Sequence, residues 1–129
     1  MALLVDHACA SARDATVFLD LGAKALSVKP GRIGLTESWT VARRSAERGA
    51  QTIVGLFGES MLGALHELSF AAAKPDRSMP AEICFLTLRE QLLTAPLAIR
   101  AGRIELPAEP GFAQCLDRDR LQRFTVSNG

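Results

Sequence analysis

The chain repeats one pattern: a short apolar run, a polar turn and an amphipathic helix. The apolar runs are Ala2–Val5, Ala25–Val28, Thr52–Leu56 and a fourth near Ala81–Phe85. After each of the first three, apolar residues recur at intervals of three and four, which is the period of a helix with one buried face. Short strands separated by helices of ten or more residues are typical of βαβ units, in which the strands lie parallel. The pattern therefore predicts an α/β fold with a parallel sheet.

The three predicted helices have recognisable boundary residues. Ser11 is expected to cap a helix over Ala12–Leu21, and Gly22 follows it as a terminating glycine. Thr36 is expected to cap the second helix. The third helix is predicted over Met61–Ala73.

The C-terminal part of the chain departs from this pattern. Two short extended segments, Leu97–Ile99 and Arg103–Leu106, flank the turn Arg100-Ala101-Gly102 and predict a hairpin. The stretch Pro107–Phe112 predicts a rigid loop, and Asp117–Phe124 predicts a short terminal helix.

Four strands and three helices fit either an open sheet or part of a closed barrel. A whole barrel of the (β/α) TIM type takes about 250 residues, and this chain has 129. Periodicity alone does not decide between the two arrangements. No stretch has the composition of a linker, so we expect residues 1–129 to form a single domain.

Composition narrows the classes of partner and compartment. The formal net charge is +1 with acids and bases interspersed, so neither nucleic acid nor a membrane is expected as a partner. Cys9, Cys84 and Cys115 are widely spaced and are expected to be reduced thiols. The sequence shows no secretory signal or long apolar span, and we therefore expect a cytoplasmic protein.

Charged residues stand where the predicted strands end. Asp6 follows the first strand, and Lys29 follows the second, where Pro30 is expected to break it. Glu59 comes after the third strand and Glu82 lies in the fourth. In a barrel of parallel strands, chemistry is built from the carboxyl ends of the strands. These four side chains are therefore the candidates for a functional site.

The local motifs around these residues occur in a definite order along the chain. They are Leu4-Val5-Asp6-His7-Ala8, the stretch LSVKPGRIGLTE over 26–37, GLFGESMLG over 55–63, IELPAEPGF over 104–112, and Leu116-Asp117-Arg118-Asp119. This order resembles the last four barrel strands and the tail of the muconate and chloromuconate cycloisomerases, in the mandelate racemase and muconate lactonizing group of the enolase superfamily. The resemblance covers essentially the whole chain. It implies a partial (β/α) TIM-type barrel of about four strands and three helices, followed by a hairpin and a short helix.

The resemblance also implies a role for each candidate residue. Asp6 matches the family's third metal-binding carboxylate, and Lys29 matches the lysine of the sixth strand that faces the substrate carbon. Glu59 matches a glutamate at the substrate pocket after the seventh strand, and Glu82 matches a catalytic acidic residue on the eighth. The implied cofactor is Mg²⁺ or Mn²⁺, which takes oxygen ligands and stabilises the enolate-like charge that develops on a carboxylate substrate.

The sequence departs from the family pattern at several positions. His7 stands where the family has an acidic residue, Gly34 is a single glycine where the family has two, and Phe112-Ala113 replaces Leu-Gly in the tail. The family's lysine pair, its other two metal ligands and its capping domain have no counterpart in this sequence. We therefore expect no cycloisomerase activity from the chain by itself.

Each candidate also has a simpler interpretation. Asp6 could cap a turn, Lys29 could be solvated, and Glu59 could be an acid that stabilises a helix N-terminus. Glu82 lies among apolar residues and is expected to face a barrel interior or pocket, since a buried carboxylate needs a partner. His7 and Asp6 are neighbours on a strand and point to opposite faces, so they are not expected to share a metal ion.

Two functions stay open at this point. The chain is either a portion of a cycloisomerase-like enzyme, which needs a complementing barrel half, or a non-catalytic remnant that folds by self-association. A half barrel has edge strands with unpaired backbone groups. On either interpretation we expect association, most simply a homodimer with two-fold symmetry.

Overall fold

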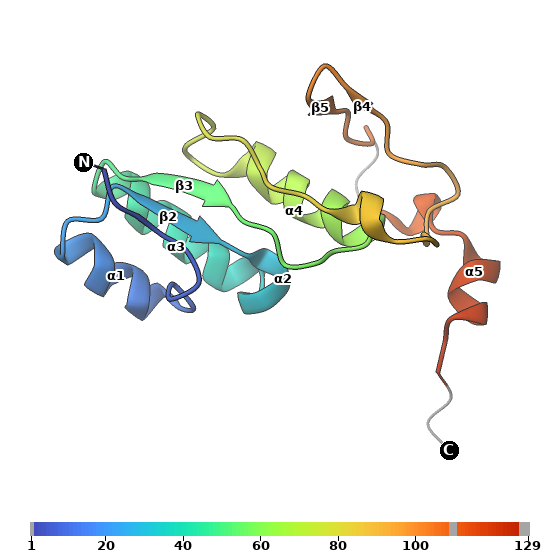
Figure 1. Ribbon diagram of the computed structural model, residues 1–129, viewed down its shortest axis with the longest axis horizontal. Helices are drawn as coiled ribbons and strands as arrows, with labels where there is room; N and C mark the ends of the chain where they lie inside the picture. Colours follow the sequence, from blue (N-terminus) through green and yellow to red (C-terminus); the bar gives the residue numbers. More distant parts are fainter. Residues whose placement is uncertain (1, 109–110, 127–129) are drawn as a thin grey trace.

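Three parallel strands form the sheet that organises the molecule. The computed structural model describes residues 2–108 and 111–126. In it β1 (Leu4–Val5), β2 (Ala25–Val28) and β3 (Gln51–Val54) lie in the order β1-β2-β3 (Figure 1). Val5 pairs with Leu26, which in turn pairs with Thr52, so the carboxyl ends of the strands point the same way. The predicted parallel sheet is confirmed.

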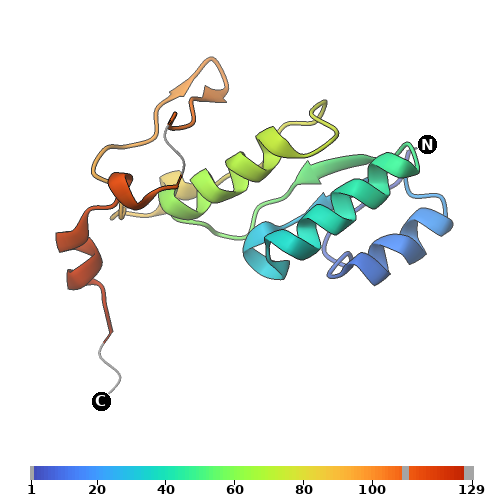
Figure 2. The same ribbon diagram turned by 180° about the vertical axis from the view of Figure 1, so that it is seen from behind.

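The helices after β1 and β2 cover one face of this sheet. Figure 2 shows the molecule from the back, and in this view α1 (Ala12–Asp20) and α3 (Leu35–Glu47) lie between the viewer and the strands. Helix α4 (Met61–Ala73) runs alongside the sheet. The predicted cap of the first helix forms, since Ser11 Oγ accepts a hydrogen bond from Asp14 N at 3.1 Å. Ser60, which the sequence analysis did not name, caps the third helix by accepting a hydrogen bond from Gly63 N at 3.4 Å. The first and third helices therefore begin where the sequence predicts.

Two groups of buried apolar side chains hold the fold together. The first, which we call the sheet core, joins the strands to α1 and α3; its members include Val5, Ala15, Leu19, Leu26, Val28, Val41, Ala42, Val54 and Phe70. The second, the C-terminal core, lies around the first half of α4; its buried members are Met61, Ala64, Leu65, Phe85 and Leu93. Helix α4 takes part in both, since Phe70 belongs to the sheet core and Leu65 to the C-terminal core.

The predicted fourth strand is reduced to a single bridge. Ala81 pairs with Val54 in parallel, and Glu82 N donates to Val54 O at 2.9 Å. The chain then turns into the short 3₁₀ helix η1 (Phe85–Thr87), because Phe85 is completely buried in the C-terminal core and draws the backbone away from β3. The prediction of a full strand over 81–85 is therefore wrong.

The segment after β2 also differs from the prediction. Lys29-Pro30-Gly31 ends the strand, but the chain goes directly into the one-turn helix α2 (Pro30–Ile33). Gly34 follows with φ +80°, a left-handed conformation suited to glycine. This turn starts α3 at Leu35, so Gly34 occupies the capping position and Thr36 does not.

The C-terminal part forms the predicted elements in shorter form. Strands β4 (Ile99–Arg100) and β5 (Arg103–Ile104) pair antiparallel across the Ala101-Gly102 turn. The 3₁₀ helix η2 (Ala113–Cys115) and the helix α5 (Arg118–Arg123) follow, and Asp117 caps α5. Within the predicted rigid loop, residues 109 and 110 lie outside the described residues.

Strand β1 has a neighbour on one side only. Among the described residues it pairs with β2, and its other edge has no partner strand. Leu3 and Leu4 are exposed at this edge. Cys9, Cys84 and Cys115 are free, in agreement with the prediction. No helix within the described part of the chain is long and apolar enough to span a membrane.

Candidate active site

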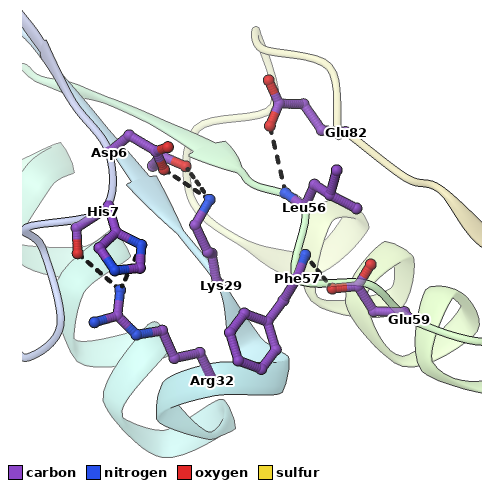
Figure 3. A network of polar contacts seen from close by, with 9 residues as sticks. Asp6, His7, Lys29, Arg32, Leu56, Phe57, Glu59 and Glu82 are labelled. Carbon is purple, nitrogen blue, oxygen red and sulfur yellow. Dashed lines mark hydrogen bonds and ion pairs between the residues drawn. The ribbon is translucent and has the colours of Figure 1, made fainter.

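Lys29 is the centre of the candidate site. It follows the last residue of β2, and its ammonium lies 2.7 Å from Asp6 Oδ1 and 3.5 Å from Ser27 Oγ (Figure 3). Its side chain is almost fully buried, whereas Asp6 is exposed. The hydrogen bond from Lys29 lowers the pKa of the Asp6 carboxyl, and a hydrogen bond from Ser27 acts in the same direction. The structure thus brings together two of the four predicted residues as an ion pair.

Gly55 makes room for this ion pair and was not identified from the sequence. It follows β3 directly, opposite the end of β2. A Cβ atom at this position would lie 2.2 Å from Ser27 Oγ and 2.6 Å from Lys29 Nζ. Both distances are shorter than real contacts, so a side chain at position 55 would displace Ser27 Oγ and the Lys29 ammonium. A glycine directly at the carboxyl end of a buried strand is the sequence signal for such a close approach.

Glu82 lies near the same edge of the sheet, beside the loop that follows β3. Its carboxylate accepts a hydrogen bond from Leu56 N at 3.3 Å, and the side chain is exposed (Figure 3). Glu82 is not buried in this chain, where its strand is only a single bridge, and its place in a barrel interior or pocket stays a prediction. The hydrogen bond still holds Glu82 beside the loop that follows β3.

Glu59 lies on that loop and is turned toward its backbone. Its Oε1 atom accepts a short hydrogen bond from Phe57 N, and the side chain is buried at the start of α4 (Figure 3). A Cβ atom at Gly63 would lie only 2.9 Å from Glu59 Cβ, so Glu59 packs along the helix. Neither Glu59 nor Glu82 forms a hydrogen bond or ion pair with Lys29 among the described contacts.

Glu67 is a buried acid that the sequence prediction missed. It lies in α4, and its Oε1 accepts a hydrogen bond from Gly31 N at 3.3 Å. Burial raises the pKa of the Glu67 carboxyl to about 7, and the negative charge of Glu59 acts in the same direction. Its position three residues after Ala64 and three before Phe70 places it on the apolar stripe of the helix. That charged residue within a buried stripe is the signal that could have identified it.

His7 contacts a different residue from Asp6. Arg32 of α2 donates to the carbonyl oxygen of His7 at 2.7 Å and approaches its Nδ1 at 3.5 Å, while Asp6 pairs with Lys29. The two neighbours therefore have separate partners among the described residues.

The residues present do not make a metal site by themselves. Mg²⁺ prefers six oxygen ligands in near-octahedral geometry. Over 2–108 and 111–126, no three His, Cys, Asp or Glu side chains lie close enough together to hold a metal ion. Asp6 offers a single carboxylate, and that carboxylate is already paired with Lys29.

Comparison with known proteins places this arrangement in a family. The model of the enolase C-terminal domain-like family matches residues 1–120. The o-succinylbenzoate synthase of Geobacillus stearothermophilus is 27% identical over an alignment of 127 residues, which covers 95% of this chain and 34% of that protein. The chain thus spans about a third of the length of this curated relative.

Solved structures show the same fold. A probable mandelate racemase from Alicyclobacillus acidocaldarius is similar with a TM-score of 0.86 and 29% identity, over 98% of this chain and 34% of that one. A muconate lactonizing enzyme from Mycobacterium smegmatis, solved with muconolactone, has a TM-score of 0.88 and 27% identity, over 98% of this chain and 36% of that one. The family match and these structures confirm the resemblance seen in the strand-end motifs, and the chain belongs to the enolase C-terminal domain-like family.

Proposed function

We propose that the chain supplies the C-terminal barrel portion of a muconate cycloisomerase-like enzyme, which acts on a carboxylate substrate through an enolate-like intermediate. The observation that supports this is the buried ammonium of Lys29, held at the carboxyl end of β2 by Asp6 at 2.7 Å. A buried lysine is costly for a protein to maintain and needs a compensating partner. Here it lies at the strand ends, where barrel enzymes carry out their chemistry.

In this proposal Lys29 transfers a proton at the substrate carbon or stabilises the charge that develops there. Glu82 lines the same edge and acts with it, while Glu59 belongs to the substrate pocket. A Mg²⁺ or Mn²⁺ ion at Asp6 would need its remaining oxygen ligands from another barrel portion. The chain is therefore expected to be inactive alone and active only when completed along the open edge of β1.

A chimera tests this function. The chain replaces the segment that it matches in the Mycobacterium smegmatis muconate lactonizing enzyme, and formation of muconolactone is followed. Lys29→Met should lower kcat by about 10²–10⁴-fold, the range for loss of a general acid–base group. Arg43→Met, an exposed residue on α3, is the matched control and should leave the rate unchanged. A chimera that folds, judged by circular dichroism, and whose activity survives Lys29→Met would contradict the proposal.

One observation favours a second candidate, a non-catalytic remnant that self-associates. Leu3 and Leu4 are exposed on the unpaired edge of β1, and such an edge is a template for pairing with another chain. We expect a homodimer by analytical ultracentrifugation, converted to monomer by Leu4→Lys. A monodisperse wild-type monomer at micromolar concentration would exclude self-association through this edge.

A further inference from the structure

The carboxyl groups of Glu59 and Glu67 both lie close to Gly31, two residues after Lys29. Glu59 directly precedes the cap of α4, and Glu67 lies two turns further along the same helix. Both are buried: 9% of Glu59 and 1% of Glu67 is exposed. They converge on Gly31, where a Cβ atom would lie 3.3 Å from Glu67 Oε1 and 3.9 Å from Glu59 Oε1.

One oxygen of each carboxyl has a backbone donor and the other does not. Glu67 Oε1 accepts from Gly31 N, and Glu59 Oε1 accepts from Phe57 N. Glu59 Oε2 and Glu67 Oε2 are buried and receive no hydrogen bond from the described residues. Two ionised carboxylates so close together and without donors would be strongly unfavourable. A single proton between them removes one charge and gives both oxygens a partner.

The charged residues around Glu67 are consistent with one proton shared between Glu59 and Glu67. Lys29 is the cation whose field lowers the pKa of Glu67, but that effect is the smallest of those acting on this carboxyl. The Lys29 ammonium is directed to Asp6. On the other elements near Glu67, α2 carries Arg32, which donates to His7, while β3 and η1 carry no charged residue. Burial and Glu59 together keep the pKa of Glu67 at about 7.

We propose that Glu67 is a positioning residue that shares a proton with Glu59, and that this pair fixes the segment carrying Lys29 to the loop carrying the pocket residue Glu59. Glu67 holds Gly31, two residues after Lys29, and Glu59 holds Phe57. The proton therefore links two sides of the candidate site. The role of the positioned residues rests on the proposed function, but the proton pair does not, and it is tested without substrate, metal or a complementing chain.

The experiment follows carboxyl ¹³C and amide ¹⁵N resonances of the 129-residue chain across roughly pH 4 to 9. Glu67 should titrate near 7, well above the ordinary glutamate value of about 4.3. The Gly31 and Phe57 amides should move with the same midpoint, since they donate to the two carboxyls. The amide of Gly49, in the turn after α3, is the control and should not respond. A Glu67 resonance that titrates as an ordinary glutamate would overturn the proposal.

Variants separate positioning from simple packing. Glu67→Gln keeps a donor and an acceptor, so the Gly31 and Phe57 amides should stay near their wild-type positions and lose the titration with a midpoint near 7. Glu67→Leu keeps the volume but no polar atom, so both amides should shift at all pH values. Glu59→Gln should lower the midpoint of Glu67 by removing the neighbouring charge. If titration of Gly31 persists in Glu67→Gln, the proposal fails, and this test holds even if Glu67→Leu does not fold.

Discussion

The ion pair between Lys29 and Asp6 should respond unequally to removal of its two partners. The Lys29 side chain is 9% exposed and that of Asp6 is 53% exposed, although their charged atoms lie 2.7 Å apart. Asp6→Ala leaves a buried ammonium with Ser27 Oγ, at 3.5 Å, as its remaining partner. Lys29→Met leaves a carboxylate that water already reaches. The first change should therefore destabilise the protein much more than the second.

The magnitudes follow from these exposures. At 2.7 Å the bare Coulomb attraction is about 1.5 kcal/mol in water and about 6 kcal/mol at an effective dielectric constant of 20, before any desolvation cost. Breaking a fully buried pair from one side costs about 3–5 kcal/mol, and an exposed pair contributes about 0–1 kcal/mol. Because only one partner is buried here, we expect Asp6→Ala to cost about 2 kcal/mol and Lys29→Met less than about 1 kcal/mol.

Urea unfolding at neutral pH and constant protein concentration measures both values, and the double variant completes a thermodynamic cycle. The lowered pKa of Asp6 adds a check: its stabilising contribution is present above the unfolded value of about 3.9 and is lost as the pH falls through the folded value. Lys29→Met should remove the larger part of that acid dependence and leave the smaller part that comes from the Ser27 hydrogen bond. The reasoning is refuted if Lys29→Met costs as much as Asp6→Ala.

Four further outcomes are expected. Gly55→Ala should cost about 1–3 kcal/mol, because its Cβ would lie 2.6 Å from Lys29 Nζ; a neutral effect in urea unfolding would contradict that placement. Phe85→Ala, at a fully buried position, should cost about 3–5 kcal/mol by the same assay, whereas a loss below about 1 kcal/mol would mean that Phe85 is not a core residue. Calorimetry with Mn²⁺ should detect no micromolar binding by the chain alone, and binding that Asp6→Ala abolishes would show a complete site. Between pH 4.5 and about 7 the folded chain holds a proton on Glu67 that the unfolded chain has lost. The free energy of unfolding should therefore fall with rising pH in this range, by at most about 3 kcal/mol. Glu67→Gln should flatten that pH dependence.

Local signals in the sequence predicted the elements that local interactions determine. Ser11 caps its helix as expected, since a cap depends on residues three positions apart. The meeting of Asp6 and Lys29 followed from parallel strands that end at one edge. In each case the controlling contact is either near in sequence or imposed by the strand order.

The features that the sequence did not predict depend on distant contacts. Whether 81–85 forms a strand is decided by Phe85, which packs into the C-terminal core rather than continuing along β3. The exposure of Glu82 follows from that turn. The sequence shows Glu67 only as a charged residue on an apolar helix stripe, whereas its partners Gly31 and Glu59 come from outside that helix. Sequence periodicity contains none of these contacts.

Helix α4 belongs to both cores, and this makes the candidate site divisible. If the C-terminal core opens while Phe70 stays in the sheet core, the loop with Glu59 loses its anchor, but Asp6 and Lys29 stay on intact strands. Partial opening of this kind is common where contiguous units differ in stability. Asp6 and Lys29 would then stay in place in a partly unfolded chain, and the site would re-form when α4 packs again. Hydrogen exchange would show the opening of the two halves of the site as separate steps.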